Sequence, residues 1–528
     1  MKYRLAMFLI PALVVPAMVI SAATAQDAAG VLAAAAKAMG SGAVKSIQYT
    51  GKGWLGSPGQ SYAPNGDWPR GDLKMYTMTI DYGSKSAKEE YVRVQGNNSK
   101  QGGGGIPIQG EQRTTNFVMA NTAWALNQKG EPNPQPQNAE IRQFMIWASP
   151  HGFIKAAQAA NTLNASDRHF AGAGRTLKVI GFTTMQKYRV TGEFNEQNLL
   201  ERVVTWIPDR VMGDMQVEIR YSDYRDVGNG VRFPHRIHAH QGDHPLLPGG
   251  NGRNWMDIQV SNVQVNVANA ALEVPAAVRN APPPQERVVA TQLNPGVWLM
   301  GGGSHNSLAV EFRDFIVVVE GPLDDSRSIP VIAEVKRVIP NKPIKYLLNT
   351  HHHFDHLGGT RAYVAEGAIV VTHEGNRNFY EDVVFAPQIR TLMPDRLSQF
   401  PWATTGPGPA PIETFTDSRA ISDGQRTIQI FHVQGLNHNQ NMAIIYLPQE
   451  RIVINADLWS PPAAGAPPPN VGQSQVTLYN NIRRLRLDVA THVPIHGNPG
   501  PHADFERIVG PVAAQQAQAG GGAAGGGE

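Results

Sequence analysis

The sequence predicts an α+β protein built from two domains, and three stretches of its 528 residues carry this prediction. Residues 26–270 contain short runs rich in Val, Ile, Tyr and Trp between Gly, Pro and Asn turns, which is typical of an antiparallel, β-rich domain. Residues 271–286 include Pro275 and the run Pro282–Pro284, which indicates a Pro/Ala linker. Residues 287–512 mix strand and helix patterns and are long enough for one further domain.

Both ends of the chain differ from the two domains in composition. A short basic start, Met1–Arg4, is followed by the apolar run Leu5–Ile20 and by the small residues Ala23–Ala25. This is the pattern of a secretory signal peptide, so we expect residues 1–25 to be removed and the protein to be periplasmic or secreted. No other stretch reaches about 18 uninterrupted apolar residues, which predicts no stable membrane insertion. The Gly/Ala-rich residues 513–528 are predicted to be a disordered tail.

The composition narrows the chemistry that the chain can perform. It contains no cysteine, which excludes disulfides, thiolate metal ligands and a cysteine nucleophile. A metal would therefore be bound by His, Asp or Glu. The net charge of +3 is small for this length and the basic residues are scattered, so we expect a small-molecule substrate and no nucleic-acid partner. The oligomeric state does not follow from the sequence.

The first domain is predicted to be one large, curved antiparallel sheet wrapped around a helix. Ala139–Trp147 has a helical pattern that Pro150 ends, and Phe153–Ala160 begins a second helix. In this pattern the domain resembles the β-sheet domains of periplasmic lipoprotein carriers. It has no catalytic motif, and its role does not follow from the sequence. Its clearest strand patterns are Ile47–Leu55, Tyr76–Tyr82, Tyr91–Gln95, Asn116–Leu126, Leu200–Trp206, Met215–Tyr221 and Val231–Gln241.

The strongest functional signal is the histidine-rich stretch Asn349–Gly359. The apolar run Ile344–Leu348 before it predicts a buried strand, and Thr360–Glu366 after it has a helical pattern, so the stretch is a strand-to-helix turn. Imidazoles and a carboxylate crowded on such a turn suit a borderline divalent metal, most often zinc. His351 and His353 are two residues apart and point the same way in an extended turn, so they can share one metal.

Asp355 and His356 project differently from those two histidines and are candidates for a second metal. The complete pattern, Thr350-His351-x-His353-x-Asp355-His356, resembles the signature of the metallo-β-lactamase superfamily. The resemblance extends over residues 287–505. It implies an αββα sandwich with the metal site at one edge of the two sheets.

The resemblance also implies three later metal ligands, and the sequence has a candidate for each in the expected order. His438 lies in a loop, Asp457 closely follows a predicted strand, and His496 lies in a Pro/Gly turn. The implied assignment is that His351, His353 and His438 bind the first metal, that Asp355, His356 and His496 bind the second, and that Asp457 bridges the two.

The resemblance and the signal-peptide pattern together predict an exported dinuclear zinc hydrolase, although other divalent metals would also fit. The expected nucleophile is a hydroxide that bridges two Zn²⁺ ions, because metal binding lowers the pKa of water to about 7, and Asp355 is expected to orient it. An aspartate at position 457 resembles the lactone, thioester, phosphodiester and alkyl-sulfate hydrolases of the superfamily, so an ester-like bond is predicted. The cysteine-using lactamases are a poor fit, because the chain has no cysteine.

Two other functions stay open from the sequence. The chain could be a periplasmic ligand-binding protein, with an apolar ligand in the β-rich domain and a vestigial metal domain. It could also be a mononuclear iron dioxygenase of sulfur compounds. Two metals per chain would favour the hydrolase over the binding protein, and oxygen consumption with bound iron would identify the dioxygenase.

Some positions allow a second interpretation. His432 competes with His438, and His492 competes with His496, but loop and turn positions favour the later residue of each pair. Asp457 could instead be a capping residue.

Other residues are expected around the metals rather than on them. His352 and His373 are predicted to support the ligands or to face solvent, and His305, on a Gly-rich turn, is a candidate for the pocket wall. The superfamily usually has a glycine before the third histidine and commonly an aspartate at the end of the hairpin before the motif. Asn437 and Glu320 occupy these positions here, and both changes bear on the shape of the pocket.

Overall fold

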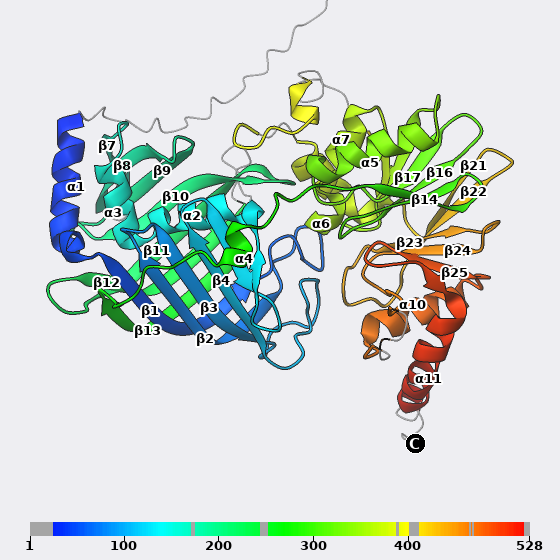
Figure 1. Cartoon of the computed structure of the whole chain (residues 1–528), viewed down its shortest axis with the longest axis horizontal. Helices are drawn as coiled ribbons and strands as arrows, with labels where there is room; N and C mark the ends of the chain where they lie inside the picture. Colours follow the sequence, from blue (N-terminus) through cyan, green and yellow to red (C-terminus); the bar gives the residue numbers. More distant parts are fainter. Residues whose placement is uncertain are drawn as a thin grey trace, which may run out of the picture.

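The computed structural model shows two domains side by side, the β-rich domain at one end and the mixed domain at the other (Figure 1). The prediction of an α+β fold is confirmed. Within the described part of the chain, no helix is both long enough and apolar enough to cross a membrane. Nearly all of the predicted signal peptide lies outside that part, which comprises residues 25–170, 175–242, 252–386, 390–400, 411–463, 466 and 469–521.

The first domain is a thirteen-stranded sheet in which neighbouring strands are antiparallel, in the order β6-β5-β4-β3-β2-β1-β13-β12-β11-β10-β9-β8-β7. The first and last strands, β1 and β13, are neighbours in the middle of the sheet, so the chain completes the sheet before the linker begins. The strands are β1 (Ser46–Gly56), β2 (Arg70–Asp81), β3 (Ser86–Val94), β4 (Gln112–Met119), β5 (Thr122–Leu126), β6 (Pro132–Pro134), β7 (Asn164–Phe170), β8 (Arg175–Thr184), β9 (Tyr188–Phe194), β10 (Leu200–Asp209), β11 (Gly213–Asp226), β12 (Arg232–Gln241) and β13 (Arg253–Val265).

Three helices pack against this sheet: α1 (Ala25–Met39), α2 (Ala139–Ala148) and α3 (Pro150–Gln158) (Figure 1). Proline at position 150 separates α2 from α3 and occupies the first turn of α3, where no backbone N–H is needed for the helix. Aromatic side chains of the helices meet those of the sheet, as in the Phe144–Tyr188 pair with ring centroids 4.6 Å apart.

The two domains are joined by the predicted linker and by direct packing. Residues 271–286 are mostly irregular and contain one short helix, α4 (Ala276–Arg279). Trp68 of the first domain meets Phe354 of the second edge to face, with ring centroids 5.6 Å apart. The guanidinium of Arg390 donates to a backbone carbonyl of the first domain at 2.7 Å. Because these contacts are buried and specific, the first domain can influence the metal-ligand turn.

The second domain has two sheets between two layers of helices, which is the predicted αββα sandwich (Figure 1). Strands covered on both faces are mostly apolar, and β17, β23 and β24 are buried along their full length. One sheet contains β14 (Val289–Asn294), β15 (Val297–Gly301), β16 (Ser307–Glu311), β17 (Ile316–Val319), β18 (Ile344–Leu348), β19 (Ile369–His373) and β20 (Ile412–Phe415). The other contains β21 (Ser418–Ser422), β22 (Thr427–His432), β23 (Ala443–Leu447), β24 (Ile452–Asn455), β25 (Thr491–Pro494) and β26 (Gly500–Pro501). The main helices are α5 (Asp325–Val338), α6 (Phe354–Leu357), α7 (Thr360–Ala365), α10 (Gln473–Arg484) and α11 (His502–Gly521).

The predicted disordered tail differs from the structure at its start. Residues 513–521 continue α11, whose buried residues include Phe505, Val509 and Ala513. These three residues are four apart, so they form one stripe of the helix and pack against the second core. The helix therefore continues past residue 513, where composition alone predicted the start of a disordered tail. Residues 522–528 lie outside the described part of the chain.

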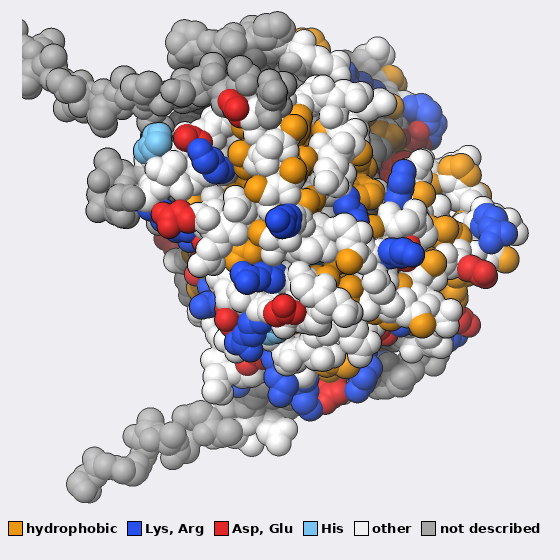
Figure 2. All heavy atoms as spheres, turned by 90° about the vertical axis from the view of Figure 1, so that its left-hand side faces the viewer, with side chains coloured by type: hydrophobic (Ala, Val, Ile, Leu, Met, Phe, Trp, Pro, Cys, Tyr) orange, Lys and Arg blue, Asp and Glu red, His pale blue; other side chains and the backbone are white. Residues whose placement is uncertain are grey.

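Figure 2 shows the end of the molecule that the first domain forms. Lys and Arg side chains on this face are interspersed with acidic, apolar and uncharged ones. This mixture agrees with the small net charge of +3.

Candidate metal centre

Four loops of the second domain converge at one end of its two sheets, and each follows a strand. The ligand turn follows β18, which lies between the parallel neighbours β17 and β19. His438 follows β22, Asp457 follows β24, and His496 follows β25, which is parallel to β24. The carboxyl ends of these strands meet at the same edge, which is where sites collect in sheets of this kind.

The His and Asp side chains of these loops form two groups. Within each group, one ligand atom per residue lies within 4.8 Å of every other. All seven predicted ligands belong to these groups, in the division that was predicted, and His305 joins them. The first group is His351, His353, His438 and Asp457, and the second is His305, Asp355, His356 and His496.

Asp457 lies between the two groups. Its Oδ2 is 3.3 Å from His351 Nε2 and 3.0 Å from His438 Nε2. The same oxygen is 3.1 Å from His356 Nε2, and Oδ1 is 3.0 Å from His496 Nε2. Burial opposes a charge on Asp457, but the neighbouring histidines outweigh it and hold its pKa well below the usual value. Its φ of 58° is in the left-handed region, a strained conformation that is common at functional sites.

The ring nitrogens of the first group are arranged as metal ligands. His353 Nε2 donates to the Ser61 carbonyl at 3.1 Å, and its buried Nδ1 has no hydrogen-bond partner among the described residues. His351 Nδ1 is 3.0 Å from Thr350 Oγ1, which leaves its buried Nε2 without a hydrogen bond of acceptable geometry. Burial lowers the pKa of His351 to about 3, so its ring is neutral at pH 7 and keeps a lone pair. Buried unpaired nitrogens are rare, and beside a carboxylate they fit a divalent metal such as zinc.

Glu320 holds the ligand turn in place from the end of β17. It is fully buried, and its carboxylate accepts hydrogen bonds from Asn349 Nδ2 at 2.5 Å and from Thr350 Oγ1. Its Oε2 also lies 3.5 Å from His356 Nδ1. Glu320 therefore orients the turn and one ligand ring, as expected of groups behind metal ligands.

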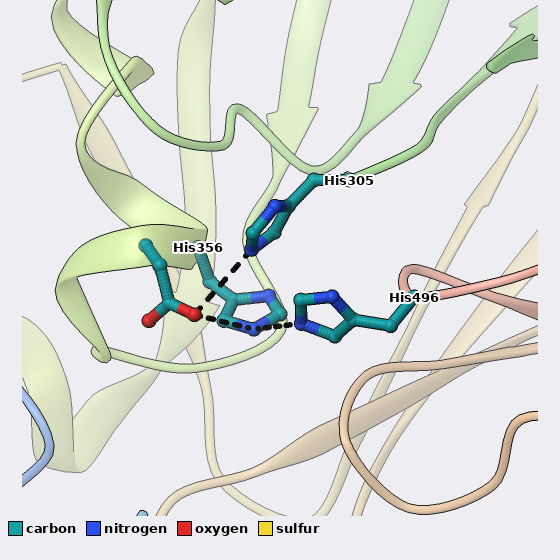
Figure 3. Close-up of side chains that lie close together, drawn as sticks. His305, His356 and His496 are labelled. Atoms are coloured by element: carbon teal, nitrogen blue, oxygen red, sulfur yellow. Dashed lines mark hydrogen bonds and ion pairs between the residues drawn. The ribbon is translucent and has the colours of Figure 1, made fainter. Parts of the chain in front are cut away.

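His305 is the member of the second group that the sequence indicated only as a pocket wall. Its ring centroid is 4.1 Å from that of His496 and 5.3 Å from that of His356. Figure 3 shows these three rings turned toward one another from three different segments. His305 Nε2 is 3.4 Å from Asp355 Oδ2, and burial lowers the pKa of His305. A glycine-rich turn does not by itself indicate a ligand, so only the fold revealed this position.

A family comparison matches this part of the chain. The model of the metallo-beta-lactamase superfamily matches residues 300–496, a range that includes every residue of the two groups. Residues 300–496 form a metallo-β-lactamase domain. The match begins after the linker and does not include the first domain.

Two curated proteins are similar to parts of this chain. A linear primary-alkylsulfatase from Pseudomonas sp. is 25% identical over 224 residues, which cover 36% of this chain and 41% of the relative. A hydroxyacylglutathione hydrolase from Pelagibacter ubique is 39% identical over 57 residues, which cover 11% of this chain and 23% of the relative. The chain thus spans less than half the length of either relative.

Solved structures of metallo-β-lactamases resemble the same part of the chain. The matches to the metallo-β-lactamases from Pontibacter korlensis and Hirschia baltica each cover 42% of this chain. They cover 98% and 97%, respectively, of the chains of those two proteins. Their sequence identities are 18% and 19%, and their TM-scores are 0.31 and 0.32. Because these TM-scores are below 0.5, the assignment of the metallo-β-lactamase domain rests on the family match and the ligand groups.

Two loops of the first domain complete the wall of the metallo-β-lactamase site. Gln60 Nε2 donates to Asp355 Oδ1 at 2.7 Å, and the Ser61 carbonyl accepts the hydrogen bond from His353 described above. Gly103 lies so close that a Cβ there would be 2.7 Å from His353 Cε1. In the sequence these residues belong to ordinary Gly-, Pro- and Gln-rich loops, and no signal marked them as part of the site.

The open side of the site is a pocket shared by both domains and α10. Its volume is about 720 Å³, which is within the range of small-molecule sites. Asp355, Asp457, His438 and His496 line it on the metal-ligand side. The other lining residues are Gln60, Gly104, Gly105, Ile106, Trp459, Ser460, Pro469, Ser474 and Gln475.

The histidines that competed with the predicted ligands lie outside the two groups. His432, on β22, has its ring 4.3 Å from that of His373. His492 is buried, with Nε2 2.9 Å from His502 Nδ1. His352 donates from Nε2 to the Ser61 carbonyl at 2.9 Å and supports the ligand turn from behind.

Proposed function

We propose that this protein is an exported dinuclear zinc hydrolase that cleaves an ester-like bond in a small molecule. The observation that carries the proposal is the position of Asp457 within 3.3 Å of ring nitrogens from both ligand groups. A carboxylate with this placement can bridge two divalent ions. Three ligands on each side leave positions open for water and substrate.

The roles of the residues follow from their positions. Two bound zinc ions would supply Lewis acidity and would lower the pKa of a coordinated water to about 7. Asp355 reaches the pocket and is held by Gln60, so it is placed to orient that water. His305 lies beside Asp355 and can donate a hydrogen bond to it or to a leaving group. Glu320 fixes the ligand turn from behind.

The choice of an ester-like bond rests on the ligand types and on the relatives. Any metals would be held without cysteine, and Asp457 lies between the two ligand groups, where it could bridge them. The curated relatives are named an alkylsulfatase and a hydroxyacylglutathione hydrolase, so a sulfate ester and a thioester are the first substrates to test. Lactones and phosphodiesters complete the panel, and a β-lactam serves as the comparison.

The test measures metal content and turnover together. Elemental analysis of the purified protein should give two zinc ions per chain. Chelation should abolish hydrolysis of one substrate in the panel, and zinc should restore it. Turnover that survives complete metal removal would overturn the proposal, and oxygen consumption with bound iron would favour the dioxygenase instead.

A matched pair of variants separates a metal site from a general loss of structure. His438→Gln should remove a ligand and lower the metal content, whereas His432→Gln alters a histidine six residues earlier that lies outside both groups. Equal metal content and turnover in both variants would exclude His438 as a ligand.

A further inference from the structure

The first domain contains a second cavity, distinct from the metal pocket. Its volume is about 510 Å³, and it lies between strands β1–β4 and helix α2. A cavity of this size is in the range that holds small organic ligands. Its lining includes Tyr49, Tyr76, Met78, Ile80, Val118 and Met145.

Several apolar side chains on the walls are incompletely covered by protein. Met78 on β2, with Ile141 and Met145 on α2, pack against the core but are only partly buried. Protein interiors are normally close-packed, so a space of this size bordered by half-covered apolar groups favours an apolar occupant.

The interior also has one polar wall. Glu89 accepts hydrogen bonds from Tyr76 Oη at 3.1 Å and from Asn116 Nδ2 at 3.0 Å. Arg142 donates to Asn116 Oδ1 at 2.9 Å and to two backbone carbonyls. The guanidinium of Arg142 lies close enough to Glu89 for the two charges to interact and offset each other, so an anionic group gains little at this end of the cavity.

A cation lies at the other border of the cavity, next to the metal pocket. Arg93 lines the cavity and donates to Ser57 Oγ at 3.1 Å, to the Gly104 carbonyl at 3.3 Å and to Gln112 Oε1 at 3.0 Å. All three acceptors are uncharged, so they do not neutralise the guanidinium. Gly104 lines the metal pocket and donates from its N–H to Gln60 Oε1 at 2.9 Å. A thin wall of these residues therefore separates the two spaces.

We propose that the first domain binds a single-chain anionic amphiphile of the fatty-acid class in this cavity. The hydrocarbon chain fills the space between the sheet and α2, and the anionic head lies against Arg93 and away from Glu89. The site is independent of metal binding, so it does not depend on the function proposed above.

The test is a titration of the full-length protein with a fluorescent fatty acid, cis-parinaric acid, in the metal-loaded and the chelated form. We expect saturable binding of one equivalent per chain in both forms. Decanoate should displace the probe. Absence of saturable binding, or binding only when metal is present, would overturn the proposal.

Variants locate the bound chain. Ala87 on β3 lines the cavity, so Ala87→Trp should fill it and weaken probe binding by about tenfold or more. Ala33→Trp, on the exposed face of α1, makes the same change elsewhere and should bind as the wild type does. Should Ala87→Trp fail to fold, Ile141→Trp enters the same space from α2. Unchanged binding in a folded cavity variant would place the ligand elsewhere and refute the site.

The charge on the head group is tested separately. Arg93→Gln in the chelated protein should weaken decanoate by about tenfold, because an ion pair is lost, and leave decanol unchanged. An equal effect on both ligands would contradict the assignment of the head group to Arg93.

Discussion

Replacing Gln60 with alanine tests whether the first domain helps to hold the second metal. Gln60 Nε2 donates to Asp355 Oδ1 at 2.7 Å, and its Oε1 accepts from the Gly104 N–H at 2.9 Å. The other oxygen of Asp355, Oδ2, lies 3.4 Å from His305 Nε2. The substitution therefore removes the shorter of these two polar contacts and leaves every ligand in place.

The magnitude follows from the strength and exposure of that hydrogen bond. A hydrogen bond to a charged group is worth about 1.5–3 kcal/mol. The Asp355 side chain is 32% exposed, so water partly replaces the lost donor and the lower end of this range applies. A loss of about 1.5 kcal/mol corresponds to roughly tenfold weaker binding of the second metal, which is within the range for groups behind metal ligands.

Competition with a chromophoric chelator measures both dissociation constants. In Gln60→Ala the second site should weaken by about tenfold, while the first site, which Gln60 does not contact, should be unchanged. Gln109→Ala removes an exposed glutamine that does not line the metal pocket and serves as the matched control. Wild-type constants for both sites in Gln60→Ala, or equal weakening of both, would refute the coupling.

Three further predictions follow from the same structure. Gly103→Ala should weaken both metal sites, because its Cβ would lie 2.1 Å from Gln60 Oε1 and 2.7 Å from His353 Cε1. Gly42→Ala, with no atom within 4 Å of its Cβ, should bind metal normally, and equal metal titrations of the two variants would contradict this. Asp457→Ala should lose both metals and turnover while the circular dichroism of the β-rich domain persists, and retained turnover would remove this residue from the site. Burial lowers the pKa of His151 to about 4, so below pH 6.5 the unfolded chain takes up a proton that the folded chain excludes until about pH 4. Between pH 7.5 and pH 5, urea unfolding should therefore show a loss of stability that is about 2 kcal/mol larger in the wild type than in His151→Gln, and identical pH dependence of the two proteins would refute the assignment.

Much of the metal site could be predicted from the sequence because its signals are local. His351, His353, Asp355 and His356 lie within six residues, and the run Ile344–Leu348 marks the strand that presents them. A strand-to-helix turn imposes directions on its side chains without help from distant residues. The alternation of strand and turn patterns likewise predicted the antiparallel character of the first domain.

The later ligands were predictable for a related reason. His438, Asp457 and His496 each follow a strand, and loops at the ends of strands are where functional groups collect. Their order in the chain matched the superfamily, and their loop and turn positions separated His438 and His496 from the competing histidines. Composition was less informative at the C-terminus, because Ala513 belongs to a packed helix and not to a tail.

Only the tertiary structure decided what the first domain does at the metal site. Gln60 and Ser61 are separated in sequence from the ligands that they contact by almost three hundred residues. Gly103 and His353 are two hundred and fifty residues apart. Contacts at this separation leave no periodicity or spacing in the chain, because they arise from the packing of two sheets that each fold on local patterns. The second cavity has the same origin. In the sequence, the partly buried side chains that line it cannot be distinguished from ordinary core residues, and the cavity exists only once the sheet and α2 have packed together.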